Sequence, residues 1–278
     1  MARLATVAAF GFPDFNPPTL LSVYQRLGCK TLQFYRNVKN PPTVQEALDV
    51  ARDVGMTYDS IHGVFGPEHD PSSLEAEIRA EAMATYRSEG ELVRELGGTG
   101  VVVHPAPMCP DPVRISPASR DARIDPMRQS MDELARLGEE LGVIYLVENI
   151  PSNYYFGSDA QQLADMLRQV NSPNLRMCFD TGHAHMTTKK TVAQDLMDCL
   201  DVVSYFHIND NDRRLDAHAI PGQGTIDWPS LATVIAKLPM DVSVMLELFH
   251  SEAEMNRQIT IGLGDKLKAW LALGQGTN

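Results

Sequence analysis

The chain has 278 residues, 44% of them hydrophobic, which is enough for one complete core. Because α/β barrels of about this length (~250 residues) are commonly one domain, we expect a single domain over residues 1–278. The 36 acidic and 24 basic residues give a net charge of −12, and the densest basic pairs are Lys189-Lys190 and Arg213-Arg214. This charge repels a phosphate backbone, so we expect no nucleic-acid partner.

The cysteines and the N-terminal stretch indicate where the protein works. Cys29, Cys109, Cys178 and Cys199 lie far apart and form no CxxC pair, so neither a disulfide framework nor a thiolate metal site is indicated. The apolar stretch before Pro13 is too short for a membrane span and lacks a convincing cleavage region. We therefore expect a cytoplasmic protein with no membrane partner.

Short apolar runs of strand length alternate along the chain with segments of helix length. This alternation is typical of parallel βα units. The predicted strands, in chain order, are residues 4–10, 31–35, 57–62, 100–104, 144–148, 175–180, 202–207 and 242–247. Eight is the number that a closed (β/α)₈ TIM barrel needs, so this α/β fold is the prediction.

Several segments between the strands carry apolar residues at three- and four-residue spacing, which predicts amphipathic helices on the outside of the barrel. They are residues 43–54, 72–96, 125–141 and 159–170. Thr43 stands three residues before Glu46 in the pattern of a capping box, and Ser158 or Asp159 opens the helix at 159–170. The stretch 105–125 holds several prolines, and we expect a long loop there over one mouth of the barrel.

Six of the predicted strands end on an ionisable residue, which is costly in a core unless it is paired. In a parallel barrel all carboxyl ends of strands meet at one mouth, so these six side chains should converge. Their nitrogen and oxygen atoms, without a soft sulfur ligand, favour a site for a divalent metal ion. The six residues are His62, His104, Glu148, Asp180, His207 and Glu247.

A structural role is the alternative for each of these residues alone. A histidine after an apolar run is more often hydrogen-bonded within the fold than a ligand, and a terminal carboxylate can cap a neighbouring helix. Six such endings in succession favour a shared metal site. His183 extends the group, because Gly182 could let the backbone after Asp180 fold back toward the ion.

The segment that follows His207 is too polar to be packed in a core. Asp210 and Asp212 fit either a solvated acidic loop or a functional role, whereas Asp216 and His218 have the alternating spacing of ligands or substrate contacts. The remaining histidines, which we expect to be peripheral or on the surface, are His69, His185 and His250.

Four motifs carry a family resemblance. They are Val-Glu-Asn at 147–149, Phe-Asp-Thr-Gly-His at 179–183, Phe-His-Ile-Asn-Asp at 206–210 and the run from His218 to Trp228. In this order and spacing the chain resembles the xylose isomerase-like TIM barrels, which include sugar epimerases, inositol-pathway enzymes and type IV apurinic endonucleases. The resemblance extends from His62 to Glu247.

Resemblance to the ketose 3-epimerases implies one ion bound by Glu148, Asp180, His207 and Glu247. It also implies that the two glutamates act as the acid/base pair on opposite faces of the substrate carbon and that His183 contacts substrate. An ion that polarises a carbonyl lowers the barrier to removing the neighbouring carbon-bound proton. The substrate-binding arginine of those enzymes has no single counterpart, because the spacing from His207 suggests Arg213 and the spacing from Pro221 suggests His218.

Resemblance to the endonucleases implies a set of zinc ligands with none missing. The mouth loops around 66–70, 108–111 and 151–156 are acidic, apolar or aromatic, whereas a duplex-binding enzyme needs cationic loops. We therefore favour an isomerase or epimerase over a zinc phosphodiesterase, and over a lyase, a dehydratase or a non-catalytic binding protein. The implied zinc set is His62, His104, Glu148, Asp180, His183, His207, Asp216, His218 and Glu247.

The expected substrate is a small sugar, keto-sugar or polyol derivative. The sequence has no clear Gly-rich phosphate cradle, which disfavours a phosphorylated one. Carboxylate and imidazole ligands admit Mn²⁺, Mg²⁺, Co²⁺ or Zn²⁺. The identity of the substrate, the number of ions and the oligomeric state, a homo-oligomer included, stay open at this point.

Overall fold

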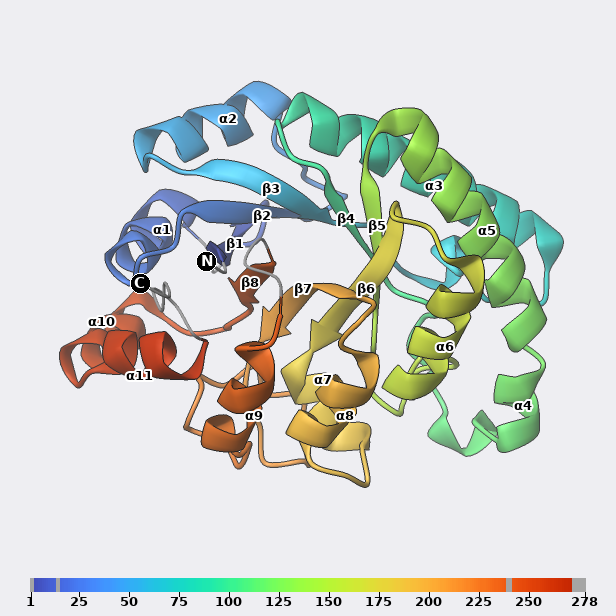
Figure 1. Ribbon diagram of the computed structural model, residues 1–278. Coiled ribbons are helices and arrows are strands. Elements are labelled where there is room, and N and C mark those ends of the chain that lie inside the picture. The colour runs from blue at the N-terminus through green and yellow to red at the C-terminus, as the bar shows by residue number, and fades with distance from the viewer. Residues whose placement is uncertain (1–2, 14–15, 239–241, 272–278) are drawn as a thin grey trace.

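The structure, a computed structural model, describes residues 3–13, 16–238 and 242–271. Eight parallel strands pair in chain order and the last pairs with the first, so the sheet closes into a barrel with helices outside it (Figure 1). This confirms the predicted single-domain (β/α)₈ TIM barrel. The strands are β1 (Arg3–Phe10), β2 (Thr31–Arg36), β3 (Thr57–His62), β4 (Gly100–Val103), β5 (Ile144–Glu148), β6 (Leu175–Asp180), β7 (Val203–Ile208) and β8 (Ser243–Leu246).

The helices follow the strands and cover the outer face of the sheet. In the described residues they are α1 (Pro17–Arg26), α2 (Val44–Asp53), α3 (Ala76–Glu95), α4 (Pro117–Asp121), α5 (Ile124–Leu141), α6 (Ala160–Val170), α7 (Thr181–Thr187), α8 (Val192–Cys199), α9 (Trp228–Ile235), α10 (Glu252–Thr260) and α11 (Leu263–Trp270). Two single 3₁₀ turns, η1 (Pro67–His69) and η2 (Pro112–Arg114), lie in the loops. No described helix combines the length and the apolar content needed to cross a lipid bilayer.

The predicted strands agree with the observed ones to within one residue at each end, and two helix starts were also predicted. Thr43 and Glu46 form the expected capping box of α2. Asp159, and not Ser158, caps α6, since its side chain accepts a hydrogen bond from Gln162 N.

Two predicted segments were wrong in part. The helix predicted from residue 72 begins at Ala76, because Asp70 accepts hydrogen bonds from the backbone and hydroxyl of Ser72 and so closes a turn before the helix. The expected loop at 105–125 contains η2 and α4 and ends with the start of α5. Ser116 opens α4 with a capping box, a signal that the many prolines of the stretch had hidden.

Alternating residues of each strand face two different cores. Tyr145 and Val147 of β5 belong to the large core between sheet and helices, whereas Leu146 faces the barrel interior. Cys178 on β6, Tyr205 on β7 and Met245 on β8 occupy the same interior cluster. The residue two positions further along each of these strands therefore also points inward, but one layer closer to the carboxyl ends.

Candidate metal centre

Four side chains meet in that next layer. Glu148 and Asp180 close β5 and β6, His207 is the penultimate residue of β7, and Glu247 follows β8 directly. All four are at least nine-tenths buried, and one ligand atom of each lies within 4.8 Å of the others. The structure thus brings together the four residues singled out as ligands, which we call the quartet.

Hydrogen bonds fix the orientation of the quartet. His207 Nδ1 lies 2.9 Å from Glu148 Oε1 and 3.1 Å from Glu247 Oε2. Asp180 caps α7: its Oδ1 accepts from His183 N at 2.6 Å and its Oδ2 accepts from Asn209 Nδ2 at 2.8 Å. Nδ1 is therefore the histidine atom that faces the carboxylates.

The quartet carries three carboxyl groups and one imidazole in a buried place. Burial alone would raise the pKa of Glu148, but His207 holds it well below its usual value. Burial would also raise the pKa of Glu247, but the charge of His207 outweighs it and lowers this pKa to about 2. Burial and the two neighbouring glutamates raise the pKa of Asp180 to about 7. An excess of buried negative charge is what a divalent cation would balance.

The donor set fits such an ion. Glu148 Oε2 is buried and has no hydrogen-bond partner among the described side chains, although His104 Nε2 lies 3.2 Å away. The ligand atoms are carboxylate oxygens and one imidazole nitrogen, which suit Mn²⁺, Mg²⁺, Co²⁺ or Zn²⁺. The four predicted ligands contain no sulfur, although the buried thiol of Cys178 lies close to Glu148 and His207. Burial raises the pKa of its thiol to about 12, so it is a protonated and weak ligand.

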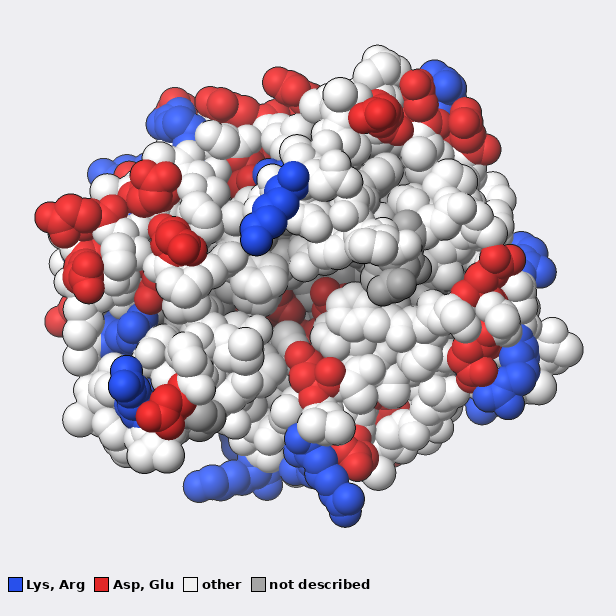
Figure 2. Space-filling view, turned by 180° about the vertical axis from the view of Figure 1, so that it is seen from behind, with Lys and Arg blue, Asp and Glu red and all other residues white. Residues whose placement is uncertain are grey.

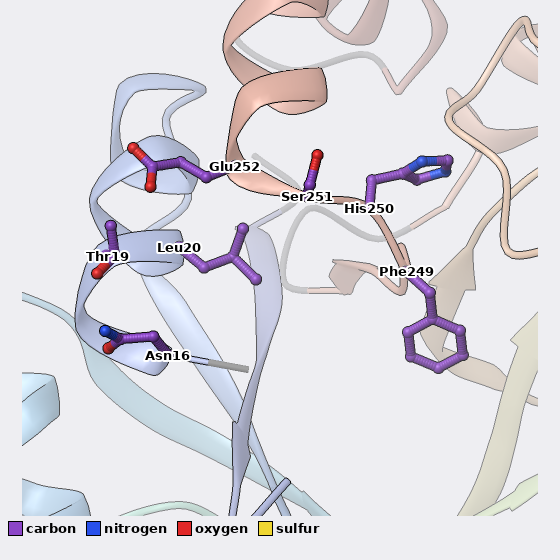
Figure 3. A pocket seen from close by; sticks show the side chains of 7 residues that line it. All are labelled: Asn16, Thr19, Leu20, Phe249, His250, Ser251 and Glu252. Atoms are coloured by element: carbon purple, nitrogen blue, oxygen red, sulfur yellow. The ribbon is translucent and has the colours of Figure 1, made fainter. Parts of the chain in front are cut away.

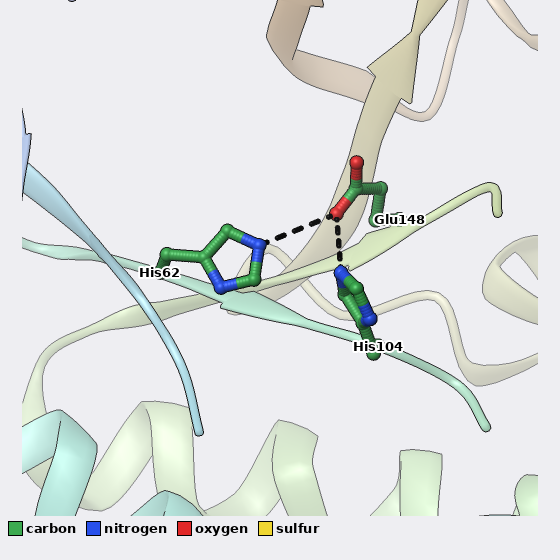
Figure 4. A group of neighbouring side chains, drawn as sticks. All are labelled: His62, His104 and Glu148. Atoms are coloured by element: carbon green, nitrogen blue, oxygen red, sulfur yellow. Dashed lines mark ion pairs between the residues drawn. The ribbon is translucent and has the colours of Figure 1, made fainter. Parts of the chain in front are cut away.

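A second group adjoins the quartet through Glu148 (Figure 4). His62 Nε2 and His104 Nε2 lie 3.9 Å and 3.2 Å from Glu148 Oε2. Burial and the neighbouring His104 lower the pKa of His62 to about 4, so its ring is neutral. His62 Nδ1 lies 3.1 Å from the carbonyl oxygen of Gly63, to which it can donate. The lone pair on Nε2 then points toward Glu148, as in a metal ligand.

A third group lies on the other side. Asp216 Oδ2 is 3.2 Å from His183 Nε2, and Asp216 Oδ1 is 3.4 Å from His218 Nε2. Burial would lower the pKa of both histidines, but Asp180 and Asp216 raise that of His183 to about 10, and Glu247 and Asp216 raise that of His218 to about 9. Two protonated rings around one carboxylate more than offset its charge, so this group needs no ion to neutralise it.

Gly182 acts differently from the expectation. Its φ is not in the left-handed region; instead, a Cβ at this position would lie 1.8 Å from Asn209 Oδ1. Glycine is needed for the close approach of Asn209, the residue that holds Asp180.

The loop after β7 carries Arg213, which was expected as a possible substrate contact. Arg213 is exposed and points away from the quartet, with its guanidinium donating to the carbonyl of Thr188 at 3.3 Å. Asp212 is also exposed, whereas Asp210 is fully buried. His218 lies at the site with φ +42°, a strained backbone for a histidine. Of the two candidates for the substrate contact, only His218 is in place.

The peripheral histidines lie outside the three groups. His69 is half-buried and its Nδ1 lies 3.1 Å from the hydroxyl of Thr85, while His185 Nε2 lies 2.8 Å from the hydroxyl of Thr225. His250 lines a hollow of about 560 Å³ between α1 and the segment from β8 to α10 (Figure 3). Phe249 lines this hollow and also the pocket at the quartet.

The pocket at the quartet is small and walled by aromatic rings. Its volume is about 170 Å³, and side chains of all three groups line it. Within the described part of the chain, no lysine or arginine does. The face opposite to that of Figure 1 is hollowed near its middle, where acidic side chains are visible (Figure 2). The aromatic side chains of the wall are Tyr35, Phe65, Tyr154 and Phe249.

The sequence did not predict most of the aromatic residues of this pocket, or the amide side chain of Gln33 that also lines it. Phe65 stacks on His104 with ring centroids 4.3 Å apart, and Phe249 lies 4.2 Å from the ring of His218. Both come from loops after β3 and β8, where an isolated phenylalanine carries no periodic signal. Gln33 on β2 also lines the pocket, but it lies within a strand and not at its end.

The chain belongs to the xylose isomerase-like TIM barrel family, whose sequence profile matches residues 21–266. The D-psicose 3-epimerase of Ruminiclostridium cellulolyticum is 24% identical over 259 residues, which cover 91% of this chain and 80% of that protein. Uncharacterized protein MJ1311 of Methanocaldococcus jannaschii is 23% identical over 189 residues, 67% of this chain. The match spans 63% of that relative, less than two thirds of its length.

Solved structures share the fold. A D-psicose 3-epimerase with D-tagatose from Clostridium cellulolyticum H10 has a TM-score of 0.72 and 17% identity and covers 98% of each chain. An AP endonuclease, family 2, from Brucella melitensis has a TM-score of 0.69 and 13% identity over 94% of this chain and 99% of its own. At such identities the likeness shows the barrel alone, since one barrel serves many reactions.

Proposed function

We propose that this protein is a divalent-metal-dependent isomerase or epimerase that moves a proton at a carbon next to a carbonyl group of a small sugar-like substrate. The observation that carries the proposal is the pair Glu148 and Glu247, whose carboxylates both lie within 3.1 Å of His207 Nδ1 and both line the pocket. The relative named D-psicose 3-epimerase, which aligns with 91% of this chain, supports the same reaction class.

Glu148, Asp180, His207 and Glu247 would hold the ion. A bound divalent ion would supply Lewis-acid polarisation of the substrate carbonyl. The protein's own residues then have to move the proton. The low pKa of each glutamate keeps it ionised near neutral pH, so either can accept a carbon-bound proton. One glutamate accepts the carbon-bound proton, and the other, once it has taken up a proton from solvent, returns a proton to the opposite face of the carbon.

The pocket favours an uncharged substrate. Among the described residues no lysine or arginine lines it, so the charged side chains that a phosphate or carboxylate group would meet are carboxylates and histidines paired with them. Its volume of about 170 Å³ is below the range of about 300–1,000 Å³ that is usual for drug-sized ligands. Aromatic rings such as Tyr154 and Phe65 offer apolar faces to the C–H groups of a sugar and exclude water from the reacting carbon.

The test measures proton transfer at carbon directly. Glu148→Gln and Glu247→Gln keep the size and one ligand oxygen of each side chain, so excess ion should restore occupancy. At saturating metal, deuterium incorporation from solvent into ketose, inosose-like and keto-acid substrates should fall by at least ~100-fold, the lower end of a general base's contribution. Glu91→Gln on the exposed face of α3 is the matched control. Near-normal exchange in both site variants would remove the two-carboxylate mechanism.

One observation favours a second candidate, a zinc-dependent phosphodiesterase. The two histidine groups, His62 with His104 and His183 with His218, adjoin the quartet on either side, and each includes residues that could hold a further ion. The net charge of −12 and the small pocket weigh against duplex DNA as a substrate. Purified protein should hold one tightly bound ion. Three zinc ions, one of them released by replacing His62 and His104, together with cleavage of abasic DNA, would support the phosphodiesterase instead.

A further inference from the structure

A buried amide contacts the far side of the His207 ring. Gln33 lies in β2, is fully buried, and its Nε2 stands 3.1 Å from His207 Nε2. In this orientation Gln33 Oε1 has no hydrogen-bond partner among the described residues. The oxygen and nitrogen of a carboxamide have nearly the same shape, so the reverse orientation fills the same space. The hydrogen-bonding partners decide which atom faces the imidazole.

The role of Nδ1, the other nitrogen of the His207 ring, determines whether the oxygen or the nitrogen of the Gln33 amide faces Nε2. His207 Nδ1 faces Glu148 and Glu247 and is the atom available to an ion. A nitrogen that binds an ion uses its lone pair and carries no proton, so in neutral imidazole the proton is on Nε2. The Nε2–H group is a donor and needs an acceptor, as metal-bound histidines usually have. Gln33 meets this need only with its oxygen toward His207.

We propose that Gln33 is a positioning residue whose Oε1 accepts a hydrogen bond from His207 Nε2–H and so holds the imidazole with Nδ1 free for the ion. This inference rests on the metal centre of the proposed function. It assigns a role to a residue that lies inside a strand, one layer below the quartet, and that contacts no other member of the quartet by a hydrogen bond in the described residues.

The polar side chains behind Gln33 can accommodate the reversed amide. Ser60 Oγ lies 3.4 Å from the amide of Gln33, 2.9 Å from Asp59 Oδ1 and 2.7 Å from Tyr205 OH. Tyr205 OH also lies 3.2 Å from Asp59 Oδ1. With the oxygen of Gln33 on this side, Tyr205 donates to Ser60 across 2.7 Å and Ser60 donates to Gln33 across 3.4 Å, so each hydroxyl proton keeps an acceptor.

Asp59 lies at the other end of this chain of hydrogen bonds. Its Oδ2 accepts from Thr31 Oγ1 at 2.8 Å and from Ser243 Oγ at 2.9 Å. The chain runs from Tyr205 through Ser60 and Gln33 to His207 inside the barrel, between strands that are held rigidly by the closed sheet. A rigid acceptor is what fixes both the tautomer and the angle of a metal-binding ring.

Zn²⁺ binding, measured by competition with a chelator, tests the role of Gln33. Gln33→Met keeps the shape and removes the acceptor, and we expect its affinity for Zn²⁺ to fall by about 10–100-fold. Gln33→Glu offers an acceptor only, and it should bind Zn²⁺ at least as tightly as the wild type. Gln45→Met, on the exposed face of α2, is the control and should bind as the wild type does.

A nuclear magnetic resonance measurement on the wild type avoids any dependence on how the variants fold. In Zn²⁺-loaded protein with ¹⁵N-labelled histidine, the ring proton of His207 should be on Nε2, and its signal should be absent in His207→Gln. Wild-type affinity in Gln33→Met overturns the role of Gln33 and leaves the metal centre intact. A proton on Nδ1 overturns the role of Gln33 and also removes His207 from the metal ligands. Failure of the wild type to bind Zn²⁺ stoichiometrically overturns the metal centre and this inference together.

Discussion

Asp210 holds the loop that carries Asp216 and His218, and its replacement should be costly. It is fully buried in the turn after β7, and each oxygen accepts two hydrogen bonds. Oδ1 accepts from Asn211 N at 2.9 Å and Ile226 N at 3.2 Å, and Oδ2 accepts from Gly222 N and Trp228 Nε1, both at 2.8 Å. Asp210→Asn keeps the size of the side chain but turns an NH₂ group toward two of these donors.

The magnitude follows from the bonds that are lost. A hydrogen bond to a charged group contributes about 1.5–3 kcal/mol, so two lost bonds cost about 3–6 kcal/mol. At roughly 2 °C for each kcal/mol in a protein of this size, Tm should fall by about 6–12 °C. Asp212→Asn, in the same loop but exposed, should stay within about 0.5 kcal/mol of the wild type. If the wild type and Asp210→Asn had the same Tm and the same free energy of unfolding in urea, Asp210 would not anchor the loop.

Three further outcomes are expected. Gly224→Ala places a Cβ 2.3 Å from the carbonyl oxygen of Asn211, so urea unfolding should show a loss of about 1–3 kcal/mol. Burial, followed by the charge of Asp159, raises the pKa of Asp195 to about 6, so the free energy of unfolding should fall as pH rises from about 4 to 6. Compared with the wild type, Asp195→Asn should be more stable by about 1 kcal/mol at pH 7 and equally stable at pH 4. Removing metal with EDTA should lower the wild-type Tm by about 5 °C, from about 2.7 kcal/mol of ion binding, and should leave Asp180→Asn unchanged.

The barrel was predictable because its strands follow a simple rule. An apolar run such as 144–147 that stops on Glu148 marks a buried strand and the mouth of the barrel at once. The same rule placed Asp180 and His207, since residues two apart on a strand face the same side and parallel strands end together. Neighbouring strands of a closed barrel then bring these ends into contact.

Residues without a strand end to mark them were harder to place. Asp210 was open between a solvated and a functional residue, and nothing local shows that the indole of Trp228, eighteen positions later, would donate to it. Arg213 was selected by counting along a loop, and loops have no fixed rise per residue. Asp59, Ser60 and Gln33 are polar residues inside strands, and only closure of the barrel brings Gln33 on β2 beside His207 on β7.

The identity of the ligands cannot decide between a one-ion isomerase and a three-ion phosphodiesterase, because the same residues serve both. The surroundings do discriminate. His183 and His218 are protonated around Asp216, so the positive charge of the two rings disfavours a further cation in this group. Among the described residues the pocket lining holds no lysine or arginine, and its two protonated histidines are paired with Asp216, which favours hydroxyl groups over a phosphodiester. The proposal of chemistry on a neutral polyhydroxy compound therefore rests on the pocket wall more than on the metal ligands.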